Sequence, residues 1–140
     1  MWLPTAMSSG TVPFHLGDER ENIVKKLPSY HAIILAKNDV GYHNLCHIIS
    51  DAHTRGFYYK PRTDKAFLAA HSEGLIASSA CLAGEIDCAI RDFGMEAAKK
   101  GLYEYLDIFG KENFYIELMY HHLEEQKEVN KGLIALAKET

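Results

Sequence analysis

The fold is decided by the stretch YHAIILAKNDVGYHNL, which covers residues 30–45. Its first half is an uninterrupted apolar run, which is typical of a strand buried on both faces, so a strand is predicted over 30–37. Asn38 or Asp39 can then cap an amphipathic helix that continues to Gly56. A buried strand followed at once by an amphipathic helix is one β/α unit.

The same pattern recurs along the chain. Two more strands are predicted, over 75–80 and 113–120. Helical crossovers between strands favour an α/β fold with a mainly parallel sheet. A mainly parallel sheet usually has more than the three strands predicted here. We therefore interpret the chain as part of a larger fold. Helices are expected from a cap at Thr63 or Asp64, over 82–93, over 95–110 and over 123–140.

Residues 1–29 differ from the rest of the chain. They contain three prolines and no sustained periodicity, so we expect an irregular segment or an edge element there. A short helix over 17–27 is the one exception that the pattern allows. The predicted organisation is therefore an N-terminal segment over 1–29 and an α/β region over 30–140.

Composition limits the classes of protein that fit. With 140 residues, of which 47% are hydrophobic, the chain can bury one globular core. A formal net charge of −4 excludes a generally basic surface for nucleic acid, although a local basic site stays open. Three cysteines without a CxxC motif do not form a disulfide framework. We find neither a signal peptide nor a membrane-spanning run, and expect a cytoplasmic protein.

Histidines offer two candidate clusters. His43, His47 and Asp51 share one helix face, and two histidines at this spacing can share a metal. The glutamate of an HExxH motif is missing, because Asn44 follows His43, so a solvated face is favoured. The opposite face carries the stripe expected to be buried: Leu45, Ile48, Ile49 and Ala52.

The second cluster follows the third predicted strand. His121 and His122 lie at the end of that strand, where α/β folds place sites, and ordinary turn residues are the alternative. Glu117 lies inside the strand and needs a partner if its carboxylate points inward.

An aromatic and basic loop is the one candidate contact for nucleic acid. Lys60 and Arg62 could meet phosphates while rings of the preceding aromatic run stack on bases. Alternatively, the tyrosines cover the core and the cations are solvated. The aromatic run consists of Phe57, Tyr58 and Tyr59.

Cys81 follows the second predicted strand, and its position favours a buried, inert thiol over the alternative, a ligand. Four sequence segments change that interpretation. YHAIILAKNDVGYHNL, GFYYKPRTD, EGLIASSACLAGEI and FYIELMYHHLEEQKEVNKGLIALA, in this order, closely resemble the PHP domain of the alpha subunit of bacterial DNA polymerase III, a C-family replicative polymerase. The resemblance runs from Tyr30 to the end of the chain.

The resemblance implies a fold and a metal site. PHP domains are distorted β/α barrels whose histidines, carboxylates and, in many members, one cysteine bind a small metal cluster. It implies His31 and Cys81 as metal ligands here. Imidazole and thiolate both suit zinc, and manganese or magnesium are the alternatives. PHP domains that keep their metals are similar to 3'-5' exonucleases, with metal-activated water as the nucleophile.

Departures from the family pattern limit this implication. The family's His-x-His motif has no counterpart within 1–29, where His15 lies in no matching context. The family's Asp-x-His motif is also absent from this sequence. Two protein ligands cannot complete even a tetrahedral zinc site. The family's QDHG reads MYHH here, so His121 matches the histidine while Tyr120 replaces the acid. Neither receives a catalytic role.

The resulting expectation is a fragment of a replicative polymerase subunit that is inactive alone. The parent would be a DNA-directed DNA polymerase, a nucleotidyltransferase whose partners are DNA and the other replicase subunits. The alternative is a non-catalytic module that braces the polymerase or its proofreading partner. An open sheet would expose apolar edges, so self-association of the fragment is expected.

One geometric problem arises from the two implied ligands. His31 begins its predicted strand whereas Cys81 follows another, and in a strictly parallel barrel these positions lie at opposite ends. Either the strand at His31 starts deep within the barrel, or it runs against its neighbours after a hairpin.

Overall fold

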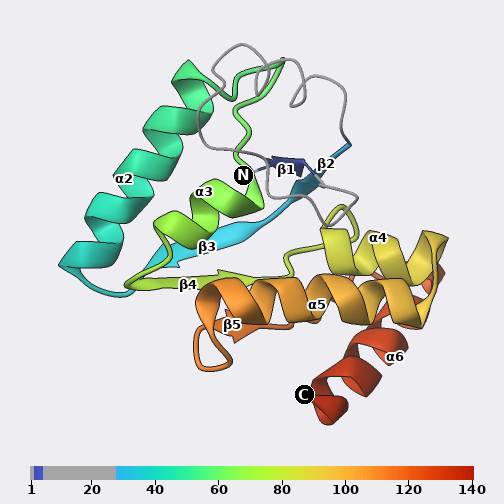
Figure 1. Ribbon diagram of the computed structural model, residues 1–140. Helices are drawn as coiled ribbons and strands as arrows, with labels where there is room; N and C mark the ends of the chain where they lie inside the picture. The colour runs from blue at the N-terminus through green and yellow to red at the C-terminus, as the bar shows by residue number, and fades with distance from the viewer. Residues whose placement is uncertain (1, 5–27) are drawn as a thin grey trace.

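A computed structural model describes residues 2–4 and 28–140 (Figure 1). Helices alternate with short strands, so the α/β class is confirmed. Among the described helices, none combines the length and apolar character that crossing a bilayer requires. The elements are β1 (Trp2–Pro4), β2 (Ser29–His31), β3 (Ile33–Ala36), α2 (Asp39–Thr54), α3 (Lys65–Ala70), β4 (Leu75–Ser78), α4 (Glu85–Asp92), α5 (Met95–Phe109), β5 (Phe114–Tyr115) and α6 (Glu124–Glu139).

The sheet is mixed, and the expectation of mainly parallel strands is wrong for the described strands. β3 pairs antiparallel with β4, β4 pairs parallel with β5, and β1 pairs antiparallel with β2. The connection from β3 runs outward along α2 and returns through α3, so β4 begins at the edge where β3 ends (Figure 1). The amide of Lys37 donates to the Gly74 carbonyl at 2.8 Å and closes this edge. The described strands form a two-stranded and a three-stranded sheet, and a closed barrel is not seen among them.

Helix caps follow the sequence closely. The side chain of Asn38 accepts a hydrogen bond from the Gly41 amide at 2.9 Å, and Asp64 accepts one from the Phe67 amide at 2.8 Å. The sequence predicts each of these caps as one of two alternatives, and the structure selects Asn38 over Asp39 and Asp64 over Thr63. Gly41 also allows close approach of two backbones, because a Cβ there would lie 1.8 Å from the Gly74 carbonyl oxygen.

The buried face of α2 differs from the predicted stripe. Ile48 and Ala52 are buried as expected, but Ile49 is 46% exposed whereas Asp51 is 4% exposed. An ion pair with Arg55 lets the Asp51 carboxylate lie against the core, because a neighbouring cation offsets its loss of water. The buried face is therefore rotated from Ile49 toward Asp51.

All three predicted strands are shorter than the sequence suggested, and β4 covers only Leu75–Ser78 of the predicted 75–80. Only Phe114–Tyr115 pair within 113–120, and the strand over 30–37 divides at Ala32 into β2 and β3. α4 begins at Glu85, three residues after the predicted start at Leu82. The predicted helix over 17–27 lies outside the described residues, while β1 and β2 agree with an edge element near the N-terminus.

The core lies where α2 packs on β3 and β4 and where α5 packs on β4 and β5. The helices α4, α5 and α6 form a second group beside the sheet, with α4 in contact with both others (Figure 1). The largest fully buried apolar side chains come from both regions, and these are Ile48, Leu68, Leu75, Ile86, Leu102, Leu133 and Leu136.

Candidate functional site

The side chains of His31 and Cys81 meet at one end of the strands, where β3 begins and β4 ends. The Nδ1 atom of His31 lies 3.3 Å from the Sγ atom of Cys81, although the two residues are 50 positions apart. The antiparallel register places Ile33 opposite Ser78, so the start of one strand and the end of the other share an edge. The second solution holds for direction, because β3 runs antiparallel to β4, but α2 and α3 connect the two strands and not a hairpin.

The loop that carries Cys81 is tightly constrained. Ala80 is fully buried with a φ of +63°, a left-handed conformation that is rare for residues other than glycine. A turn follows, in which the Gly84 amide donates to the Cys81 carbonyl at 2.6 Å. The His31 amide donates to the Ala83 carbonyl at 2.8 Å, so backbone and side chain both tie β2 to this loop.

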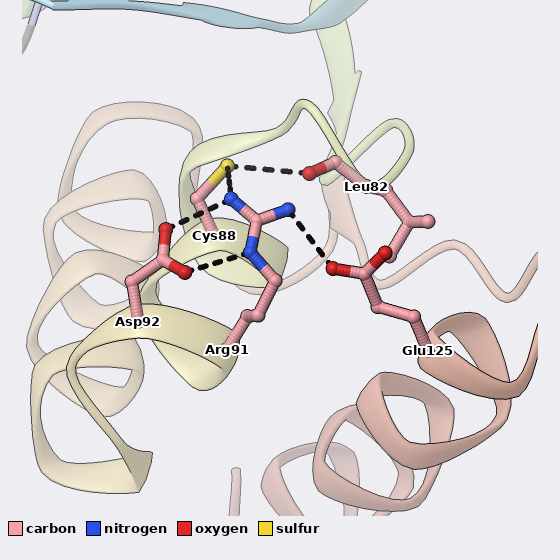
Figure 2. Close-up of polar contacts among 5 residues, drawn as sticks. All are labelled: Leu82, Cys88, Arg91, Asp92 and Glu125. Carbon is pink, nitrogen blue, oxygen red and sulfur yellow. Dashed lines mark hydrogen bonds and ion pairs between the residues drawn. The ribbon is translucent and has the colours of Figure 1, made fainter.

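A second cysteine supports the same loop from α4. The thiol of Cys88 donates to the Leu82 carbonyl at 3.2 Å (Figure 2). Burial raises the pKa of the Cys88 thiol, so it remains a protonated donor. Arg91 lies 3.7 Å from the Cys88 sulfur and pairs with Asp92 and with Glu125 of α6. Cys88 is thus a structural thiol, and Figure 2 shows Arg91 bridging α4 and α6 beside it.

Glu117 faces the same edge of the sheet and has partners there. The Ser78 hydroxyl donates to its carboxylate at 2.7 Å, and its own amide donates to the Ser79 hydroxyl at 2.9 Å. Burial lowers the pKa of His31, and the negative charge of Glu117 acts in the opposite direction. His31 is therefore neutral near pH 7, and a neutral imidazole can act as a ligand or hydrogen-bond acceptor.

Asp87 in α4 was not anticipated from the sequence. Its side chain is 1% exposed, and neither carboxylate oxygen has a hydrogen-bond partner within normal geometry among the described residues. Burial raises its pKa to about 7, although the side chain of Gln126 acts in the opposite direction. An acidic residue in the first turn of a helix is ordinary, so no sequence signal marked this one.

A partly buried ionic network connects the helices behind the site. Lys65 of α3 contacts the carboxylates of Glu85 at 2.7 Å and Glu104 at 2.6 Å. The Tyr105 hydroxyl donates to the other oxygen of Glu85 at 2.8 Å. The Lys65 ammonium lies 4.6 Å from the centre of the Tyr105 ring. The network joins α3 and α5 to the first turn of α4, directly after the Cys81 loop.

The other candidate residues lie apart from this pair. His43 and His47 are exposed, as a solvated face requires, but Asp51 of the same predicted face is buried and pairs with the exposed Arg55. Lys60 is exposed, whereas Arg62 is partly buried.

The two histidines after β5 are exposed turn residues in the structure. His121 contacts the sulfur of Met119 at 3.4 Å, and the His122 ring lies against that of Tyr120. Neither contact involves the His31 and Cys81 pair.

The donors at the site suit a metal in kind but not in number. A neutral imidazole and a thiol are common zinc ligands, and 3.3 Å between them is compatible with both binding one ion. Across residues 2–4 and 28–140, no group of three histidine, cysteine or carboxylate side chains is arranged to hold an ion. Since a zinc site needs three or four protein ligands, His31 and Cys81 do not form a complete one by themselves.

Known proteins match most of the chain. The family described as PHP domain matches residues 8–121 and so begins within 1–29, which leaves the boundary at residue 30 as a prediction. The DNA polymerase III subunit alpha of Treponema pallidum is 44% identical over 108 residues, which cover 77% of this chain and 9% of that protein. The same subunit of Thermus aquaticus is 44% identical over 109 residues (78% and 9%), and that of Borreliella burgdorferi 43% over 111 residues (79% and 10%). The chain spans about a tenth of the length of these relatives.

Proposed function

Because this chain belongs to the PHP domain family and matches the alpha subunit of bacterial DNA polymerase III, we propose that it is part of such a subunit. The supporting observation is an identity of 44% over 77% of the chain, to a protein of which the matched residues make up only 9%. The parent enzyme would synthesise DNA on a template in the cytoplasm. Its partners would be DNA and the other subunits of a replicase.

Within that subunit, we propose His31 and Cys81 as two ligands of a metal site of the metal-dependent 3'-5' exonuclease or phosphoesterase type. Their contact, the neutral imidazole and the constrained Cys81 loop support this assignment. Zinc is the preferred ion, because nitrogen and sulfur donors suit it better than they suit manganese or magnesium. The chain alone is expected to be inactive, since two ligands do not hold a catalytic metal cluster.

Zinc titration of purified variants tests the ligand assignment. Cys81→Ser and His31→Ala should each lower the affinity of the chain for zinc at least tenfold, because each removes one of two donors. Cys46→Ser is the matched control, since Cys46 is an exposed thiol on α2. If zinc affinity is the same in the parent chain and in both variants, the assignment is wrong.

A second function is favoured by the number of ligands. Because the described residues hold no group of three metal-binding side chains, the domain could instead be a non-catalytic module that braces the polymerase or its proofreading partner. The coding sequence on either side discriminates between these functions. His-x-His and Asp-x-His words there favour the metal-dependent enzyme, and their absence favours the structural module.

A further inference from the structure

The turn over residues 57–60 presents an aromatic ring to solvent. The Tyr58 amide donates to the Lys60 carbonyl at 3.1 Å, so the chain reverses direction at Tyr59. Tyr59 has a φ of +57°, a left-handed conformation that is rare for bulky side chains. Its side chain is 83% exposed, the highest value among the large hydrophobic residues of the described segments. Tyr59 is therefore held away from the core in a strained conformation, a combination often found at functional sites.

The base of the turn is closely packed. The backbones of Gly56 and Arg62 approach so closely that a Cβ on Gly56 would lie 1.9 Å from the Arg62 carbonyl oxygen. The guanidinium of Arg62 lies 5.3 Å from the centre of the Tyr58 ring, and the Tyr58 and Tyr59 rings meet edge to face at 4.7 Å. A fixed ring loses little conformational freedom when it binds a partner.

The structure separates the two interpretations that the sequence left open for this loop. Tyr58 and Arg62 are partly buried against each other, which is a supporting role. Tyr59 and Lys60 are both exposed at the tip, where an aromatic face and a cation are adjacent. This pairing fits a nucleic-acid strand, in which bases stack on rings and phosphates contact cations. In a duplex the base faces are covered, so an unpaired strand fits better.

We propose that Tyr59 stacks on a base of single-stranded DNA while Lys60 contacts a neighbouring phosphate. Arg62 does not contact the strand and instead positions the turn through Tyr58. The choice of DNA as the ligand rests on the proposed function as a polymerase subunit. The roles of the Tyr59 ring and the Lys60 cation are inferred from the geometry of the turn alone.

Fluorescence anisotropy with labelled oligo(dT) tests the proposal. The 140-residue chain is titrated at low salt in the presence of EDTA. Tyr59→Ala should weaken binding about tenfold, since stacking contributes this much for a single base, while Tyr59→Phe should bind like the parent chain. Tyr103→Ala is the matched control, because Tyr103 is an exposed tyrosine on α5. Lys60→Ala should reduce the slope of log K against log salt by about 1.

Three results would overturn the proposal. They are no binding of oligo(dT) by the parent chain, equal binding by Tyr59→Ala and the parent, or equal loss in Tyr59→Ala and Tyr103→Ala. Circular dichroism of each variant confirms that the fold is retained. Because EDTA removes metal ions, this outcome is independent of zinc binding at His31 and Cys81. Failure of the zinc titration would therefore leave the DNA result standing, and the reverse also holds.

Discussion

Replacing the buried carboxyl group of Asp87 should make the chain more stable, and increasingly so as pH rises. In the folded chain the pKa of Asp87 is raised from 3.8 to about 7, mainly by burial. The folded state therefore holds a proton that the unfolded chain releases above pH 3.8. Protonation stabilises the fold fully below that value, and this contribution is lost as pH rises through about 7.

The size of the effect follows from the two pKa values. A difference of roughly 3 in pKa corresponds to about 4 kcal/mol at most, since each unit is worth 1.36 kcal/mol. Roughly half of this, about 2 kcal/mol, is lost between pH 5.5 and pH 8.5. Asp87→Asn cannot ionise and nearly conserves the shape of the protonated side chain. Its stability relative to the parent should therefore rise by about 2 kcal/mol over this range.

Urea denaturation followed by circular dichroism measures this difference at several pH values and constant ionic strength. Asp92→Asn is the matched control on the same helix. A hydrogen bond from Arg91 lowers the pKa of Asp92, so its carboxylate stays ionised across the range in both states and the effect of its substitution should not vary with pH. The reasoning is refuted if the stability difference for Asp87→Asn is the same at pH 5.5 and pH 8.5.

Two further predictions concern the packing of the chain. Tyr105→Phe should lower the free energy of unfolding by about 1–2 kcal/mol, because it removes a buried hydrogen bond to Glu85. Tyr103→Phe, on an exposed face, should change it by less than about 0.5 kcal/mol, and equal effects of the two would contradict the role of the network. Light scattering should show species heavier than 15.8 kDa, since Leu35 of β3 and Tyr115 of β5 are more than half exposed on the outer strands of the sheet. Leu35→Lys should reduce this association, and a monodisperse parent chain would exclude it.

Zinc binding, but not DNA binding, would separate the two functions proposed for the domain. Loss of zinc affinity in both ligand variants would favour an enzyme site that other parts of the subunit complete. Zinc-independent binding of single-stranded DNA through Tyr59 would fit either function, because a structural module of a replicase also lies close to DNA.

Local features of this protein were predictable because neighbouring residues determine them. The caps at Asn38 and Asp64 follow from side chains that reach amides three residues away. The end of α5 at Gly110, which has a φ of +79°, follows from the conformational freedom of glycine. The resemblance also selected His31 and Cys81, and the structure places these two side chains in contact.

The α/β class and most helix ends thus follow from local sequence patterns, whereas the choice of His31 and Cys81 follows from the family resemblance. The tertiary structure alone decided the antiparallel direction of β3, because direction depends on the path of α2 and α3 between the strands. It also decided that Asp51 is buried while Ile49 is exposed, and that Asp87 has a raised pKa. Burial and ion pairing are set by residues distant in the chain, and no local periodicity contains that information.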